Sequence, residues 1–146
     1  MSQNDDVLRS EFDLEFTYTR TYGDVLSKFF TELKDQKVLG IKGSQGQVIC
    51  PPLEYDPQTS DELTEFVEVA STGVVTTYSW VSEPLHKHPL QTPFAWVLVK
   101  LDGADTAMLH ALDCQRGDVK SGAKVKIRWA ANRVGTIRDI ECFEMA

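Results

Sequence analysis

The chain has 146 residues, of which 42% are hydrophobic and 25% are charged, and its formal net charge is −7. This length suits one domain with a buried core, and the acidic balance disfavours a general nucleic-acid binder. No apolar run is long enough to span a bilayer, and the N-terminus is too polar for a signal peptide. The three cysteines, Cys50, Cys114 and Cys142, indicate reduced thiols, so we expect a cytoplasmic protein.

Residues 1–21 divide into a polar tail and a segment of regular alternation. From Phe12 to Thr19 apolar and polar residues alternate, which predicts a strand. The apolar face of this strand carries Phe12, Leu14, Phe16 and Tyr18. Aromatic side chains are favoured both in cores and at interfaces, so this face either packs on its own domain or docks on another protein.

Residues 22–62 are predicted to form a helix and then a turn-rich segment. Thr21 and Asp24 have the spacing of a capping box. Apolar residues recur at helical spacing toward an expected end near Gln36, at Val25, Leu26, Phe29, Phe30 and Leu33. The stretch from Lys42 to Thr59 is rich in turn formers and contains the double proline Pro51-Pro52, which favours a small knuckle of turns and short strands.

Residues 63–146 are predicted to be β-rich. A first pattern at 66–69 leads through a turn at Ser71 to Gly73 into a strand, and a proline-rich loop runs from Glu83 to Pro93. The strand patterns that follow the turn cover 74–81, 94–101, 106–113, 123–130 and 136–143. Short strands with glycine turns and no long helix predict a five-stranded Greek-key barrel of the OB type, so the expected class is mainly β.

The stretch from Lys42 to Thr59 resembles the zinc ribbon of the DUF35 family, which are OB-fold, acyl-CoA-associated proteins. In that family a CxxCG pair and a CPxC pair flank a short β run and prolines. Here Gly46 matches the glycine of the first pair, and Val48 to Pro52 match the run and the prolines. The resemblance then assigns the four ligand positions to Lys42, Gln45, Asp56 and Thr59, none of which is a cysteine. It implies a ribbon skeleton without a zinc site.

The similarity to the family extends from Tyr22 to Phe143. Proteins similar in this way are small subunits associated with thiolase-superfamily enzymes, including thiolases, acyltransferases and thiolase-like aldolases of steroid side-chain breakdown, and some pair with MaoC-type hydratases. The resemblance implies a non-catalytic accessory subunit that stabilises such an enzyme acting on acyl-CoA, in steroid side-chain or lipid degradation, without a cofactor of its own. The candidates for the partner interface are Phe12, Leu14, Phe16, Tyr18, Pro51, Pro52 and Tyr55.

Other readings of the chain remain open. Lys124, Lys126 and Arg128 alternate before Trp129, so their side chains project from one face of a strand. This strip is either a solvated face or a site for CoA phosphates or another acidic ligand, which allows a stand-alone acyl-CoA-binding module. A nucleic-acid-binding OB protein is disfavoured by charge.

Histidine and cysteine give weak signals for a site. A weak enzyme could use His110 or Cys114, although no nucleophile motif accompanies them. His86 and His88 could join the distant His110 around a metal ion, but we expect the two loop histidines to be ordinary surface residues.

Overall fold

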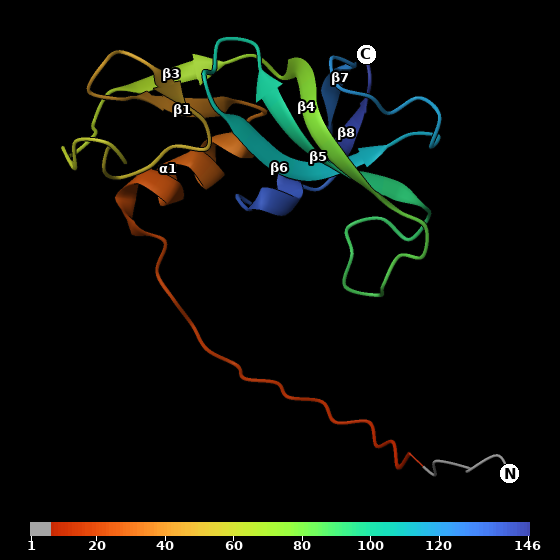
Figure 1. The fold of residues 1–146 in the computed structure, drawn as a ribbon. Helices are drawn as coiled ribbons and strands as arrows, with labels where there is room; N and C mark the ends of the chain where they lie inside the picture. The colour runs from red at the N-terminus through yellow and green to blue at the C-terminus, as the bar shows by residue number, and fades with distance from the viewer. Residues whose placement is uncertain (1–6) are drawn as a thin grey trace, which may run out of the picture.

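The computed structural model describes residues 7–146. Its elements follow the order α1 (Gly23–Leu33), β1 (Val38–Lys42), β2 (Val48–Ile49), β3 (Phe66–Val69), β4 (Thr72–Val81), β5 (Phe94–Leu101), β6 (Ala107–Asp113), β7 (Lys124–Trp129), η1 (Ile137–Asp139) and β8 (Ile140–Met145). The strands form a three-stranded sheet of order β2-β1-β3 and a closed barrel of order β4-β5-β6-β8-β7 (Figure 1). The predicted class, mainly β with an N-terminal helix and a five-stranded barrel, is confirmed.

Residues 7–22 contain neither a helix nor a strand, and the segment leads away from the folded part of the chain (Figure 1). The prediction of a strand from Phe12 to Thr19 is therefore wrong for the single chain. A strand needs a neighbour to pair with its N–H and C=O groups. The closed barrel has no free edge to offer, and the segment pairs with neither edge strand of the smaller sheet, β2 or β3. The alternating pattern is present, but no strand of the same chain satisfies it.

The helix α1 begins at Gly23 and buries Phe29 and Leu33. Tyr22 precedes it, and no side chain caps its first turn, so the predicted capping box of Thr21 and Asp24 does not form. The helix ends at Leu33, before the predicted end near Gln36. Gln36 adopts a φ of 61°, and this left-handed conformation turns the chain out of the helix.

In the smaller sheet β1 lies at the centre and pairs antiparallel with both neighbours. Its register places Ile41 opposite Ile49 in β2 and Gly40 opposite Val67 in β3. Residues 66–69, which we assigned to the domain of the barrel, therefore belong to this sheet. Their short run of apolar residues could not distinguish one sheet from the other.

The barrel closes through β4, which pairs with β5 along one edge and with β7 along the other. Gly73 pairs with Leu101 of β5 on one side and with Val125 of β7 on the other. A Cβ atom on Gly73 would overlap the carbonyl oxygen of Lys100 and would lie 2.8 Å from the Leu101 Cα. The glycine that we assigned to a turn therefore lies inside a strand, where it permits close approach of two backbones.

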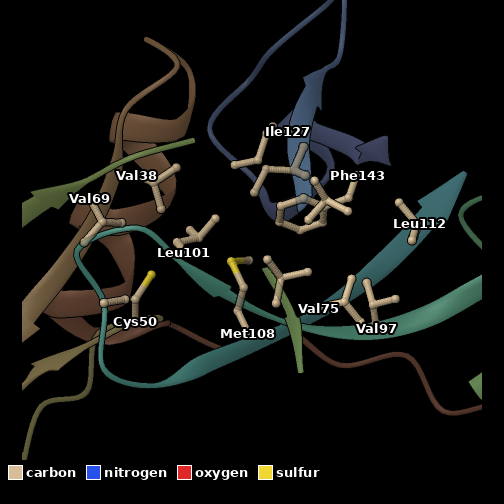
Figure 2. Packing of buried hydrophobic residues seen from close by; sticks show 14 of the residues in the cluster. Val38, Cys50, Val69, Val75, Val97, Leu101, Met108, Leu112, Ile127 and Phe143 are labelled. Carbon is tan, nitrogen blue, oxygen red and sulfur yellow. The ribbon is translucent and has the colours of Figure 1, made fainter. Parts of the chain in front are cut away.

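One apolar cluster joins the barrel to the helix and the smaller sheet (Figure 2). Val97 and Phe143 of the barrel are fully buried, and Val38, Cys50 and Val69 from the smaller sheet reach the same cluster. Cys50 leaves only 1% of its surface exposed, so its side chain packs in the core.

Hydrogen bonds also attach β2 to the barrel. The Val48 N–H donates to the Asp105 carboxylate at 2.8 Å, and the Cys50 N–H donates to the Thr106 hydroxyl at 2.8 Å. Thr106 returns a bond of 3.0 Å to the Cys50 carbonyl. The loop between β5 and β6 thus fixes β2 and Cys50, in the middle of the turn-rich segment. Among residues 7–146, no helix has the length and apolar character needed to cross a membrane.

Candidate functional site

Two turns at the outer end of the smaller sheet carry or adjoin the four positions to which the resemblance assigns the zinc ligands. The first turn lies between β1 and β2, where the Gly43 N–H donates to the Gln47 carbonyl at 2.7 Å. The second lies between Asp56 and Asp61, where the Asp56 N–H donates to the Asp61 carbonyl at 2.8 Å. We call residues 42–61, which contain both turns, the ribbon segment.

The carboxylate of Asp56 joins the two turns. Its Oδ2 accepts the Ser44 N–H at 2.8 Å and the Gln47 side-chain amide at 3.1 Å, both from the first turn. Its Oδ1 accepts the N–H groups of Gln58 at 2.8 Å and Thr59 at 3.2 Å, within the second turn. Only 2% of Asp56 is exposed, so this polar group is buried with its hydrogen-bonding capacity filled.

A second carboxylate reinforces the contact between the turns. Asp61 Oδ2 accepts the Ser44 hydroxyl at 2.9 Å and the Thr59 hydroxyl at 2.7 Å. The two hydroxyl oxygens are themselves 2.8 Å apart. We call this network the Asp56 clasp, and its members are Ser44, Gln47, Asp56, Gln58, Thr59 and Asp61.

The residues of the clasp do not fit a zinc ion. Zinc needs four lone-pair donors in a tetrahedral array, whereas the groups that surround Asp56 direct N–H hydrogens toward its oxygens. Lys42 presents an ammonium group, which forms an ion pair with Glu65. Gln45 reaches toward the side chain of Gln58, at 3.4 Å. At this place, hydrogen bonds make the cross-link between the two turns.

Hydrogen bonding lowers the pKa of both clasp carboxyls. For Asp56 the largest cause is the N–H of Ser44, followed by the N–H of Gln58. For Asp61 the hydroxyls of Thr59 and Ser44 lower the pKa. Donors that stabilise the charged form make protonation harder, so the clasp is built around ionised carboxylates.

The candidates for the partner interface differ in how accessible they are. In the N-terminal segment, the exposed fractions are 81% for Phe12, 67% for Leu14, 77% for Phe16 and 80% for Tyr18. In the ribbon segment Tyr55 is 58% exposed, and Leu53, which the sequence analysis did not select, is 43% exposed. Pro51 is half-buried and Pro52 is buried, so the prolines shape the segment and offer little surface.

The basic strip of β7 is largely neutralised. Arg128 donates to Asp113 at 2.9 Å and to Glu141 at 2.7 Å. Lys126 lies 3.7 Å from Glu144, Lys124 is exposed, and Trp129 is half-buried against the core. The three cations do share a strand face, as predicted. Most of their charge, however, is directed at neighbouring carboxylates.

The cysteines and His110 lack the features of activated groups. Burial raises the pKa of the Cys50 thiol to about 12 and that of the Cys142 thiol to about 11. Burial, with Asp118 and Asp113, also raises the pKa of Cys114. Thiolates are the nucleophilic form of cysteine, so a raised pKa makes these groups less reactive. Burial lowers the pKa of His110, which keeps its imidazole neutral.

The sequence analysis did not find two features of the structure. One is the hub at Asp56, for which Asp56-Pro57-Gln58-Thr59 gave a local signal, because an aspartate at the start of a turn accepts N–H groups two and three residues on. The other is a cavity of about 850 Å³ whose lining includes His86, His88 and His110. The sequence raises these three histidines only as possible metal ligands. No spacing in it indicates the cavity, because the barrel topology brings the walls of the cavity together.

Comparison with known proteins finds a family match over most of the barrel strands. Residues 66–130 match the family model described as ChsH2, C-terminal OB-fold domain. None of the curated proteins matches the chain. A DUF35-family protein of unknown function from Sulfolobus solfataricus is 25% identical in its solved structure, with a TM-score of 0.59, and the match covers 72% of this chain and 78% of that one.

A second solved structure, of the Ltp2-ChsH2(DUF35) aldolase, contains a chain that is 20% identical to this one. The TM-score is 0.60, and the match covers 86% of this chain and 98% of that chain. These likenesses agree with the closed five-stranded barrel and with the resemblance read from the ribbon segment. The chain is therefore similar to DUF35 proteins and shares their OB-fold.

Proposed function

We propose that this chain is a non-catalytic accessory subunit that binds and stabilises a thiolase-superfamily enzyme, a thiolase or thiolase-like aldolase acting on acyl-CoA. The observation that carries the proposal is the likeness to a chain of the Ltp2-ChsH2(DUF35) aldolase, which covers 98% of that chain. That structure names a DUF35 component beside Ltp2 in an aldolase. A fold shared over almost the whole length of such a component makes the same kind of assembly the best-supported role.

The chemistry of the described residues supports a role without catalysis. The raised pKa of Cys114 and the lowered pKa of His110 both follow from burial. Neither group is activated by a hydrogen-bonded base or acid in the way that nucleophilic catalysis requires. In this proposal the catalytic residues lie on the partner enzyme.

The N-terminal segment supports a role in assembly. It has the alternation of a strand, and four of its apolar side chains are exposed, namely Phe12, Leu14, Phe16 and Tyr18. A segment of this kind can add a strand to an exposed sheet edge of another protein, where backbone hydrogen bonds give affinity and alternate side chains give specificity. Tyr55 adds an exposed aromatic side chain in the ribbon segment.

Finer features of the role rest on the family resemblance alone. They are a MaoC-type hydratase as an additional partner, direct contact with acyl-CoA, and a place in steroid side-chain or lipid degradation. The stand-alone acyl-CoA module gains no support from the strip at Lys124, Lys126 and Arg128, because carboxylates already pair with two of its cations. A net charge of −7 continues to disfavour nucleic acid.

Co-expression with thiolase-like proteins from the same genome tests the proposal. We expect the full chain to co-elute with one of them in size-exclusion chromatography. The double variant Phe12→Ser, Phe16→Ser should weaken this complex by at least about tenfold, since buried aromatic anchors dominate interface energies. The matched control Asp13→Ala, Thr17→Ala changes the other face of the same segment and should keep the affinity.

Two outcomes would contradict the proposal. One is the failure of every thiolase-like protein of the genome to co-elute with the intact chain. The other is turnover that is lost in the Cys114→Ala or His110→Ala variant while the complex still assembles. The first result removes the partner, and the second moves catalysis onto this chain.

A further inference from the structure

The cavity of about 850 Å³ is built from elements that the proposed function does not use. The loop of residues 82–93 between β4 and β5 forms one wall, and η1 with the start of β8 forms another. The floor comes from β5 and β6. Its lining includes none of the candidates for the partner interface and none of the basic strip of β7.

Apolar side chains line the floor and one wall of this cavity. Trp96 of β5 and Ile140 of β8 are partly or fully buried there. Leu109 of β6 and Ile137 of η1 also line it, and they leave 61% and 39% of their surfaces exposed. Such apolar surface facing a cavity gains free energy when a ligand removes it from water.

Basic groups lie at the rim of the same cavity. Lys87 comes from the β4–β5 loop and Arg138 from η1, and both are exposed. Among residues 7–146, Arg138 makes no ion pair. His86 and His88 flank Lys87 in the loop and also line the cavity. The rim therefore presents two full charges and two imidazoles to whatever enters.

Acidic groups do not cancel this charge. Glu141 is the acidic residue of the lining, and its carboxylate accepts the Arg128 Nε–H at 2.7 Å. Asp139 of η1 is buried, and its oxygens accept the N–H groups of Val134 at 2.9 Å and Gly135 at 2.7 Å. Both carboxylates are thus committed to partners outside the cavity, so neither of them pairs with Lys87 or Arg138.

The loop side of the cavity is held in position before any ligand binds. His88 Nδ1 accepts the Leu85 N–H at 3.1 Å, and the His88 ring lies edge-on to Phe94 at 5.4 Å and to Trp96 at 6.0 Å. With Nδ1 occupied as an acceptor, Nε2 is the nitrogen that carries the hydrogen in the neutral ring. A side chain held in position in this way loses less conformational entropy when a ligand binds.

The rim already contacts a carboxylate in the structure. The Glu15 carboxylate of the N-terminal segment lies 3.4 Å from the Lys87 ammonium group, with both side chains largely exposed. An ion pair this exposed contributes little to stability, so a ligand can replace Glu15 at small cost. The contact also shows which kind of group the rim attracts.

We propose that this cavity binds a small molecule that carries an anionic oxygen group, a carboxylate or a phosphate, on an apolar body. The anion is held by Lys87 and Arg138 at the rim, and the apolar body covers Trp96, Leu109 and Ile137. The proposal concerns a site whose lining includes none of the candidates for the partner interface, and it does not depend on the identity of a partner enzyme.

Titration of the isotope-labelled full chain by NMR tests the site. The probes are decanoate and decyl phosphate, and the controls are decanol, which lacks the anion, and acetate, which lacks the apolar body. All are used below the concentrations at which they form micelles. We expect saturable shifts of the Trp96 indole and of the Leu109 and Ile137 amides with at least one of the two probes, and weaker or no effects with the controls. Stronger binding of one probe identifies the preferred anion.

Substitutions at the rim separate charge from apolar contact. The variant Lys87→Gln, Arg138→Gln changes two exposed side chains, and we expect it to weaken binding of the preferred probe by at least about tenfold, because charge-assisted hydrogen bonds are the stronger ones. The matched control Arg116→Gln removes an exposed cation that does not line the cavity and should leave binding unchanged. Unchanged thermal unfolding of the variants shows that they are folded.

The proposal is overturned if neither probe shifts the resonances of the cavity. It is also overturned if decanol binds as tightly as both probes, since the rim charges then have no role. Shifts confined to the amides of residues 12–18 would show that the probes bind the N-terminal segment, which equally excludes the cavity as the site.

Discussion

The barrel and the outer end of the ribbon segment lie in the same chain, but different interactions stabilise them. In the barrel, a closed ladder of strands surrounds side chains such as Val97 and Phe143, which are 0% exposed. At the outer end of the ribbon segment the apolar contacts come mainly from Ile41, Ile49 and Leu63. The remaining cross-link between the two turns is the Asp56 clasp.

This difference shows what a small β knuckle needs in order to stay folded. Three apolar residues bury little surface, so they contribute little folding free energy. Knuckles of this size that bind a metal gain folding free energy from the bound ion. Here a buried carboxylate with four donors makes the link, and Asp105 and Thr106 of the barrel fix the other end of β2. The barrel is stabilised by the burial of apolar side chains away from water, whereas the clasp is stabilised by hydrogen bonds to its charged carboxylates.

Removal of a large side chain from the barrel should cause the largest loss in the free energy of unfolding. The Phe143→Ala variant leaves a cavity among strands β6, β7 and β8, and such changes cost about 3–5 kcal/mol. Because the helix and the smaller sheet share this core, the whole described fold should lose stability together. Urea unfolding followed by tryptophan fluorescence measures the change.

Met145→Ala provides the control for this variant. Met145 lies on the same strand but is 38% exposed, so its truncation removes few buried contacts. We expect a loss of about 1 kcal/mol or less, within the range of ordinary surface substitutions. Equal losses in the two variants would contradict the assignment of the main stabilising core to the interior of the barrel.

Substitution of Asp56, the central carboxylate of the clasp, should destabilise the two turns of the ribbon segment and leave the barrel unchanged. The Asp56→Asn variant places an amide NH₂ group among N–H donors and removes the charge that those donors stabilise. Amide hydrogen exchange at Ser44, Gln58 and Thr59 should accelerate by at least about tenfold, because bonds to charged groups are worth more than neutral ones. Barrel amides such as that of Val97 should keep their protection.

Glu62→Gln is the matched control, since it neutralises an exposed carboxylate next to the clasp without touching it. Its exchange rates should equal those of the unmodified chain. If Asp56→Asn leaves the exchange of all three clasp amides unchanged, the turns are held by packing alone, and the contrast with the barrel disappears.

The barrel could be predicted because its determinants are local. Strands such as β5 carry an apolar pattern that is sufficient to identify them, and loops with proline and glycine separate them. Pairing partners are not local. The pattern at Phe66–Val69 therefore did not show that this strand pairs with β1, and the strand predicted from Phe12 to Thr19 is wrong because the segment pairs with no strand of the described chain.

The site was harder to predict because it depends on contacts between distant residues. The bonds from Gln58 and Thr59 to Asp56 are local and follow from an aspartate-proline turn. The bond from Ser44 crosses between two turns and requires the register of β1 with β2. Likewise, the neutralisation of Arg128 by Asp113 and Glu141 requires three different strands to meet or adjoin.

Acid should weaken the clasp while the barrel core is unaffected by the same protonation. The folded chain holds the pKa of Asp56 and of Asp61 below the ordinary value for an aspartate. Ionisation of these groups therefore stabilises the fold fully above the unfolded-state pKa of about 3.9, and this stabilisation is lost as the pH falls through the lower folded-state values.

Exchange protection of the Ser44, Gln58 and Thr59 amides, corrected for intrinsic rates, should be constant from neutral pH to about 4 and should decrease below it. Asp56→Asn removes one titrating group and should flatten that decrease, while Glu62→Gln should leave it in place. A decrease of the same size in Asp56→Asn would assign the acid sensitivity to other carboxylates.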